Sequence, residues 1–66
     1  MDGMTDDQFA ELTKDYVAAT EARLALIKAD LPATPEAVAT YRELADREWA
    51  LGHAWDTELQ RVAQQG

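Results

Sequence analysis

Few residues of this 66-residue chain could do chemistry. His53 is the only histidine, and Asp56 follows it at the i, i+3 spacing that could offer two metal ligands on one helix face. The Glu-x-x-His pattern of di-iron bundles is missing, because Ala50 stands three residues before His53. Serine and cysteine are absent, so the usual pairs of nucleophile and base cannot be assembled from this chain alone. The sequence therefore predicts no catalytic, metal-binding or cofactor-binding residues, and a protein that is not an enzyme.

Two charged residues, Arg23 and Glu48, interrupt otherwise apolar stripes. Burying ionised groups is costly unless they are paired. In an antiparallel hairpin that turns near residue 33, Arg23 lies level with about residue 44, which leaves it roughly 6 Å from Glu48 at helical rise. Helical side chains lean toward their own N-terminus, so these two lean toward each other. We expect a structural ion pair that sets register, or else separate partners for each residue across an oligomer interface.

The elements that position these residues are predicted to be helices. Thr5 with Gln8 forms a capping box, which marks a helix start at residue 6. Alanine, leucine and charged helix formers then dominate, and neither glycine nor proline occurs from Asp6 to Leu31. The first helix is therefore expected over about residues 6–31.

The turn is expected at residues 32–34, with a second helix directly after it. Thr34 is a suitable N-cap, and Pro35 fits the first helical position, where its missing N–H costs little. This helix is expected over about residues 35–63, with one interruption at Gly52 that costs about 1 kcal/mol relative to alanine. So short a turn makes the two helices antiparallel neighbours.

The fold expected for residues 1–66 is a single all-α domain, an antiparallel two-helix hairpin. Apolar residues at helical spacing define a stripe on each helix that should face the other helix. The expected inward residues are Phe9, Leu12, Tyr16, Thr20, Arg23, Leu24, Ile27 and Leu31 on the first helix, and Ala37, Tyr41, Leu44, Glu48, Leu51, Trp55, Leu59 and Val62 on the second.

Further apolar residues widen this surface beyond what one facing helix can cover, namely Val17, Leu26, Val38, Ala45 and Trp49. Two helices cannot bury a sizeable core. We therefore expect a second hairpin, from an identical chain or a different protein, to complete a four-helix bundle by dimerisation.

The aromatic residues of the second helix are candidates for contacts with a partner, because tryptophan is common both in cores and at interface hot spots. Trp55 lies on the inward stripe, which favours a core position. Trp49 lies roughly 100° round the helix from that stripe, beside Gly52, where another backbone could approach. The predicted partner interface is Tyr41, Glu48, Trp49 and Trp55.

The net charge of −7, from 13 acidic and 6 basic side chains, disfavours direct binding to nucleic acid or to an anionic membrane surface. The N-terminus is acidic where a signal peptide would be basic, and no apolar run approaches the roughly 18–20 residues of a membrane span. A cytoplasmic location is therefore expected.

Acidic residues should gather at the open end of the hairpin. They are Asp6, Asp7, Glu11, Asp56 and Glu58. Such a surface could be solvated only, could dock a basic partner, or could mimic nucleic acid as an inhibitor.

Half of the chain carries short motifs that occur together elsewhere. They are Asp-Leu-Pro at 30–32, Glu-Ala at 36–37, Tyr41, and Gln-Arg-Val at 60–62. These resemble the small subunit of bacterial exodeoxyribonuclease VII, a short acidic helical hairpin that associates with a large nuclease subunit. The turn here is one residue longer, Leu44 stands where that family usually has glycine, and the first helix does not align. The resemblance implies a small non-catalytic subunit of a larger enzyme.

The sequence as a whole favours a small non-enzymatic accessory or regulatory protein that binds protein, as a homodimer or as a subunit of a hetero-complex. The alternatives are the acidic inhibitor and the nuclease-subunit role. The frequent use of alanine, arginine and aspartate suggests a bacterial or phage origin.

Overall fold

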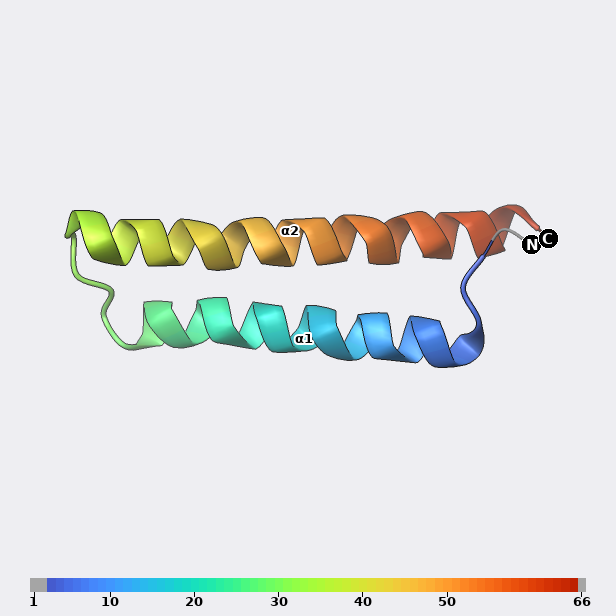
Figure 1. Ribbon diagram of the computed structural model, residues 1–66, viewed down its shortest axis with the longest axis horizontal. Helices are drawn as coiled ribbons and strands as arrows, with labels where there is room; N and C mark the ends of the chain where they lie inside the picture. The colour runs from blue at the N-terminus through green and yellow to red at the C-terminus, as the bar shows by residue number, and fades with distance from the viewer. Residues whose placement is uncertain (1–2, 66) are drawn as a thin grey trace.

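The computed structural model describes residues 3–65, which form two helices packed against each other as an antiparallel hairpin (Figure 1). Helix α1 comprises Asp6–Lys28 and helix α2 comprises Pro35–Gln64. The start of α1 and the end of α2 lie at one end, called the open end below, and the turn lies at the other (Figure 1). The hairpin measures 47 × 16 × 16 Å. The expected all-helical hairpin is confirmed.

Local capping sets where each helix begins. The Thr5 hydroxyl accepts a hydrogen bond from the Gln8 N–H at 3.1 Å, and the Gln8 side chain accepts one from the Thr5 N–H at 3.0 Å. At the start of α2, the Thr34 hydroxyl accepts from the Ala37 N–H at 3.2 Å, with Pro35 as the first helical residue. These bonds satisfy backbone donors that a helix N-terminus leaves without partners.

Helix α1 ends at Lys28, three residues before the expected end. Asp30 adopts a φ of 58°, in the left-handed region, which stops the helix and which aspartate tolerates better than most residues. Pro32 adds to this effect, because the proline ring disfavours helical backbone at the residue before it, Leu31. Proline therefore disfavours helical conformation one residue before its own position. The first helix expected to about residue 31 was too long.

The contact between the helices follows a heptad pattern. On α1, one set of covered residues is spaced alternately by three and four positions, and α2 shows the same spacing, as expected for a left-handed coiled coil. These seam residues are Phe9, Leu12, Tyr16, Ala19, Arg23 and Leu26 on α1, and Ala37, Tyr41, Leu44, Glu48, Leu51, Trp55 and Glu58 on α2. Within residues 3–65, only Ala19 and Glu58 are buried, and they are 4% and 9% exposed. The seam is therefore a narrow strip and not an enclosed core.

The largest cluster in the seam surrounds Trp55. Its indole ring stacks on Phe9 with centroids 5.9 Å apart and lies 5.9 Å from the ring of Tyr16. The indole N–H of Trp55 donates to the Thr13 hydroxyl at 2.8 Å. Trp55 is thus held by α1 of its own chain.

Candidate protein-binding face

Arg23 and Glu48 meet across the seam within one chain. The Arg23 Nε donates to Glu48 Oε1, and Arg23 Nη2 lies 3.4 Å from Glu48 Oε2. The Thr20 hydroxyl donates to the same carboxylate at 2.9 Å. Three groups from two helices therefore converge, which fixes the level at which α1 and α2 face each other.

This pairing shifts the pKa of both groups. Hydrogen bonds from Arg23 first, and from Thr20 second, hold the pKa of the Glu48 carboxyl below its ordinary value. The hydrogen bond with Glu48, followed by one with Tyr41, raises the pKa of the Arg23 guanidinium. Tyr41 is half-buried in the seam of α2, one of the positions covered by α1.

Glu58 is turned inward at the open end. Arg61 Nε donates to both of its carboxylate oxygens at 3.1 Å, and the Met4 N–H lies 3.3 Å from Oε2. The hydrogen bonds from Arg61 are the main cause that lowers the pKa of Glu58, and burial opposes them. The Glu58 carboxylate is thereby engaged within the chain and ties the segment before α1 to the end of α2.

These two carboxylates predict a loss of stability in acid. Their folded pKa values lie below the value of about 4.3 for an unfolded glutamate, so the stability they contribute is fully present above that pH. It is lost as the pH falls through their folded pKa values. We expect the melting temperature, followed by circular dichroism, to decrease over this window. A Glu48→Gln variant should have a lower melting temperature at neutral pH and a smaller decrease in acid. An equal decrease of the melting temperature with pH in the variant and the wild type would contradict the prediction.

The other acidic residues assigned to the open end are exposed. They are Asp6, Asp7, Glu11 and Asp56. Asp56 accepts a hydrogen bond from the Gln60 side chain at 2.8 Å. Four of the five expected carboxylates are therefore available to solvent, and the fifth, Glu58, is not.

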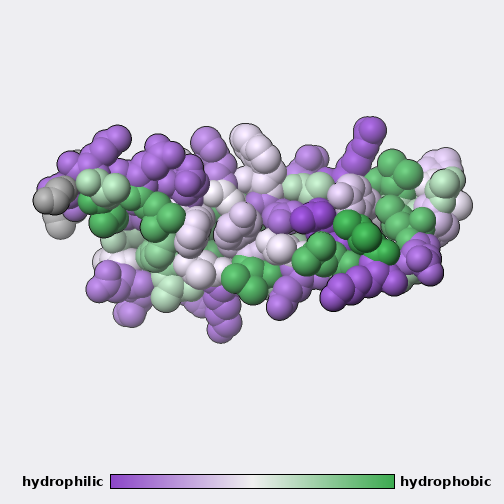
Figure 2. All heavy atoms as spheres, turned by 180° about the vertical axis from the view of Figure 1, so that it is seen from behind, coloured by the Kyte–Doolittle hydropathy of each residue, from purple (hydrophilic) through white to green (hydrophobic). Residues whose placement is uncertain are grey.

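Large apolar side chains remain exposed along the hairpin. Trp49 is 70% exposed, and six others are between 39% and 52% exposed. One face, seen in Figure 2, carries hydrophobic side chains over both helices, with paler and hydrophilic ones between them. The exposed set, called the apolar face below, is Val17, Leu24 and Ile27 on α1, and Val38, Trp49, Leu59 and Val62 on α2.

Six of the seven lie on the same side of the seam, and the seventh, Val62, follows Glu58 by four residues and so continues the seam of α2 itself. At roughly 100° per residue, each of the six is displaced from the seam of its helix in the same rotational sense. Because the helices are antiparallel, equal displacement brings both sets to one face of the hairpin. A hollow at the open end agrees with this, since Phe9 of α1 lines it together with Leu59 and Val62 of α2.

Several of these residues were expected to face inward, and the structure corrects that expectation. Leu24 and Ile27 are exposed because the seam of α1 passes through Ala19 and Leu26. Leu59 is exposed because Glu58 occupies the seam instead. A strict heptad count carried back from Arg23 would have found Ala19, so this signal was present in the sequence.

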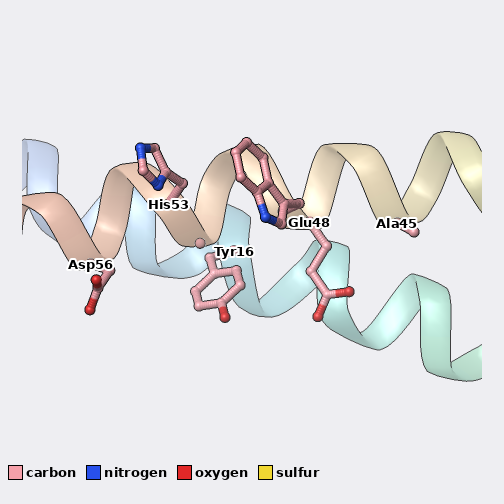
Figure 3. Close-up of a pocket in the computed structure, with 7 residues that line it drawn as sticks. Tyr16, Ala45, Glu48, His53 and Asp56 are labelled. Carbon is pink, nitrogen blue, oxygen red and sulfur yellow. The ribbon is translucent and has the colours of Figure 1, made fainter.

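A hollow of about 400 Å³ lies at the middle of the apolar face, called the central hollow below. Figure 3 shows the Tyr16 ring of α1 between the side chains of Asp56 and Glu48 of α2. The Trp49 indole stacks on His53 with centroids 5.1 Å apart and planes 2° from parallel. The lining residues are Tyr16, Ala45, Glu48, Trp49, Gly52, His53 and Asp56.

Gly52 has a role inside the chain that the sequence did not predict. We expected it to admit the backbone of a partner, but the Tyr16 ring of the same chain already fills that space. A Cβ atom at Gly52 would lie 2.9 Å from ring carbons of Tyr16, too close for a normal contact. Glycine therefore lets the ring pack on the α2 backbone.

The effect of Gly52→Ala should depend on Tyr16. In a Tyr16→Ala background the substitution is expected to stabilise the chain by about 1 kcal/mol, because alanine has the higher helix propensity. With Tyr16 present, displacement of the ring should reduce or reverse this gain. The measurement is a double-mutant cycle by urea unfolding. Equal effects in both backgrounds would show that the ring does not need the glycine.

Across residues 3–65, no group of three or more His, Cys, Asp or Glu side chains could hold a metal ion. Neither helix, over the same residues, combines the length and hydropathy needed to cross a membrane.

Comparison with known proteins finds no family model, no curated protein and no solved structure that matches this chain. The likeness to the exodeoxyribonuclease VII small subunit therefore rests on the short motifs alone.

The residues assigned to a partner interface thus fall into two groups. Tyr41, Glu48 and Trp55 are half-buried in the seam, where Glu48 accepts from Thr20 and Trp55 stacks on Phe9. Trp49 is the most exposed of the large apolar side chains and borders the central hollow.

Proposed function

We propose that this chain is a small non-enzymatic protein that acts by binding protein through the apolar face, as part of a four-helix assembly. The observation that carries the proposal is that six of the seven exposed large apolar side chains lie on one side of the seam, over both helices. Contiguous apolar surface of this kind is typical of interaction sites. The role is that of an accessory or regulatory protein, and a bacterial or phage cytoplasm is its proposed setting.

The exposed area supports this function. The chain exposes 5173 Å² of accessible surface, whereas a compact monomer of 7.3 kDa would expose roughly 4,200 Å². The radius of gyration of 14.9 Å likewise exceeds the roughly 11 Å of a compact domain of this length. The excess of about 1,000 Å² is similar to the roughly 800 Å² that each partner buries in a stable interface.

The experiment that tests the proposal is site-specific photo-crosslinking in cells that express the chain. A photoreactive residue replaces Val17, which belongs to the apolar face, and in a matched variant it replaces Ala22. Both positions are exposed on α1, but they lie roughly 140° apart round the helix. We expect protein adducts from position 17 and few from position 22.

Adducts of equal yield from both positions would show that the apolar face is not the binding surface. An absence of adducts from both would contradict binding through the hairpin altogether. The mass of the adduct separates a second copy of the chain from a different protein.

A second candidate function uses the open end, where Asp6, Asp7, Glu11 and Asp56 are exposed. These carboxylates could dock a basic protein or block a nucleic-acid-binding enzyme. Such binding should weaken steeply with salt and survive Trp49→Ala, whereas binding through the apolar face should depend little on salt. Measuring partner binding by the wild type and by Trp49→Ala at increasing salt concentrations distinguishes the two functions.

A further inference from the structure

We infer that the occupant of the apolar face is a second copy of this chain, aligned antiparallel, with a two-fold axis beside Trp49. The inference rests on the proposed function and names its partner and geometry. It is carried by four features: the dimensions of the face, the position of Trp49, the difference in charge between the two halves of the hairpin, and the order of charges along α2.

The dimensions of the face match a hairpin of the same size. Its long side measures 47 by 16 Å, an area of about 750 Å², and each partner in a stable dimer buries roughly 800 Å². A second hairpin aligned along the full length therefore covers the whole apolar face. Shorter overlap would leave one end of the face exposed in both copies.

Full overlap brings the two Trp49 side chains together. Trp49 is the fifteenth of the 30 residues of α2, so it lies at the middle of the longer helix. With a two-fold axis at the middle of α2, the Trp49 indole of each copy faces the central hollow of the other copy. Ala45 lies beside Trp49 in this hollow of about 400 Å³, and its small side chain leaves room for an incoming ring. Large aromatic residues at the centre of an interface commonly dominate its affinity.

The charge distribution selects the antiparallel arrangement. In residues 3–16 and 50–65, six carboxylates and two cations give a net charge of −4, and these residues form the half with the open end. Residues 17–49 hold six carboxylates and four cations, a net charge of −2. Placing the open end of one copy against the turn end of the other keeps the more acidic halves apart.

The charges of α2 are arranged so that two antiparallel copies, centred on Trp49, place opposite charges side by side. Arg42 stands seven residues before it and Asp56 seven residues after, so all three lie in one row on the helix surface. An antiparallel partner related by an axis at Trp49 places Arg42 of each copy level with Asp56 of the other. Val38 then lies level with residue 60 of the other copy, next to Leu59, so apolar side chains also meet.

The first experiment measures the molar mass by light scattering after size exclusion at micromolar concentration. We expect twice the chain mass of 7.3 kDa, with high helicity on the same sample. A monomer, folded or unfolded, or a higher oligomer would overturn the inference.

The second experiment tests the alignment with cysteine variants, which are unambiguous because the sequence has no cysteine. Mixed Val38→Cys and Leu59→Cys chains should form a disulfide under mild oxidation. Each variant alone should form little, because two copies of residue 38 would lie roughly 33 Å apart at helical rise. A disulfide between two Val38→Cys chains, or none in the mixture, would overturn the antiparallel alignment.

A charge exchange checks the same register without disulfides. Arg42→Asp and Asp56→Arg alone should each weaken the dimer several-fold, and the double variant should recover most of the wild-type dissociation constant. Failure of the double variant to recover would contradict the axis at Trp49.

These results separate the inference from the proposed function. If the purified chain is monomeric but position 17 crosslinks to a different protein in cells, the inference fails and the proposed function remains. If no adducts form and the chain is monomeric, both fail.

Discussion

Replacing Trp55 with alanine is expected to unfold much of the hairpin. Trp55 stacks on Phe9, contacts Tyr16 and donates to Thr13, so it joins the helices through most of their aromatic contact. Truncating a tryptophan in a core costs about 3–5 kcal/mol, and the lower figure applies to a half-buried ring. A single core in a chain of this length rarely supplies more than about 3–5 kcal/mol in total. The substitution therefore removes most of the net stability.

The measurement is the helical circular dichroism signal on heating. A loss of about 3 kcal/mol corresponds to a melting temperature lower by roughly 12–24 °C in a domain of this size. Trp55→Phe is the control, because it keeps a ring against Phe9 and loses the bond to Thr13, and it should melt between the other two proteins. An unchanged melting temperature for Trp55→Ala would show that the aromatic cluster does not hold the helices together.

Replacing Trp49 with alanine is expected to act on association and not on the hairpin itself. The side chain is 70% exposed and stacks on His53 of its own helix, so its loss should change the stability of one chain by no more than about 0.5 kcal/mol. In an interface centred on this residue, truncation should cost about 2–4 kcal/mol. The dissociation constant of the dimer then rises roughly 30- to 700-fold.

Sedimentation equilibrium over a concentration series measures this change. Arg47→Ala is the control, because Arg47 is also exposed on α2 but lies away from the apolar face, and it should leave the dissociation constant unchanged. Raising the concentration of Trp49→Ala should restore the dimer by mass action. A dissociation constant equal to that of the wild type would exclude Trp49 from the interface.

The two tryptophans differ although they stand only six residues apart on one helix. Trp55 occupies a heptad position of the seam, whereas Trp49 follows Glu48, which occupies the seam itself. A shift of one residue turns a side chain by roughly 100°, which is enough to move it from the contact line to the apolar face. The ion pair of Arg23 with Glu48 thus contributes to the exposure of Trp49, because it fixes which residues face α1.

The features that depend on a few neighbouring residues could be predicted from the sequence alone. The caps at Thr5 and Thr34 follow from side-chain oxygens placed before free backbone N–H groups, and they are present as predicted. The antiparallel hairpin follows from a short turn between two segments that are rich in helix-forming residues. These features are local, since their energies are set within about one helical turn.

Which apolar side chains are covered depends instead on how the two helices pack together. Burial depends on the supercoil that two helices adopt together, and a rule based on one helix cannot supply that register. For this reason Glu58 lies in the seam while Leu59 is exposed, and the Tyr16 ring takes the space over Gly52 that a partner was expected to use. Glu58 is therefore not part of the exposed acidic end. Four residues predicted to face inward are exposed instead, namely Leu24, Ile27, Leu59 and Val62. In each case the burial depends on contacts with the other helix, which is distant in sequence.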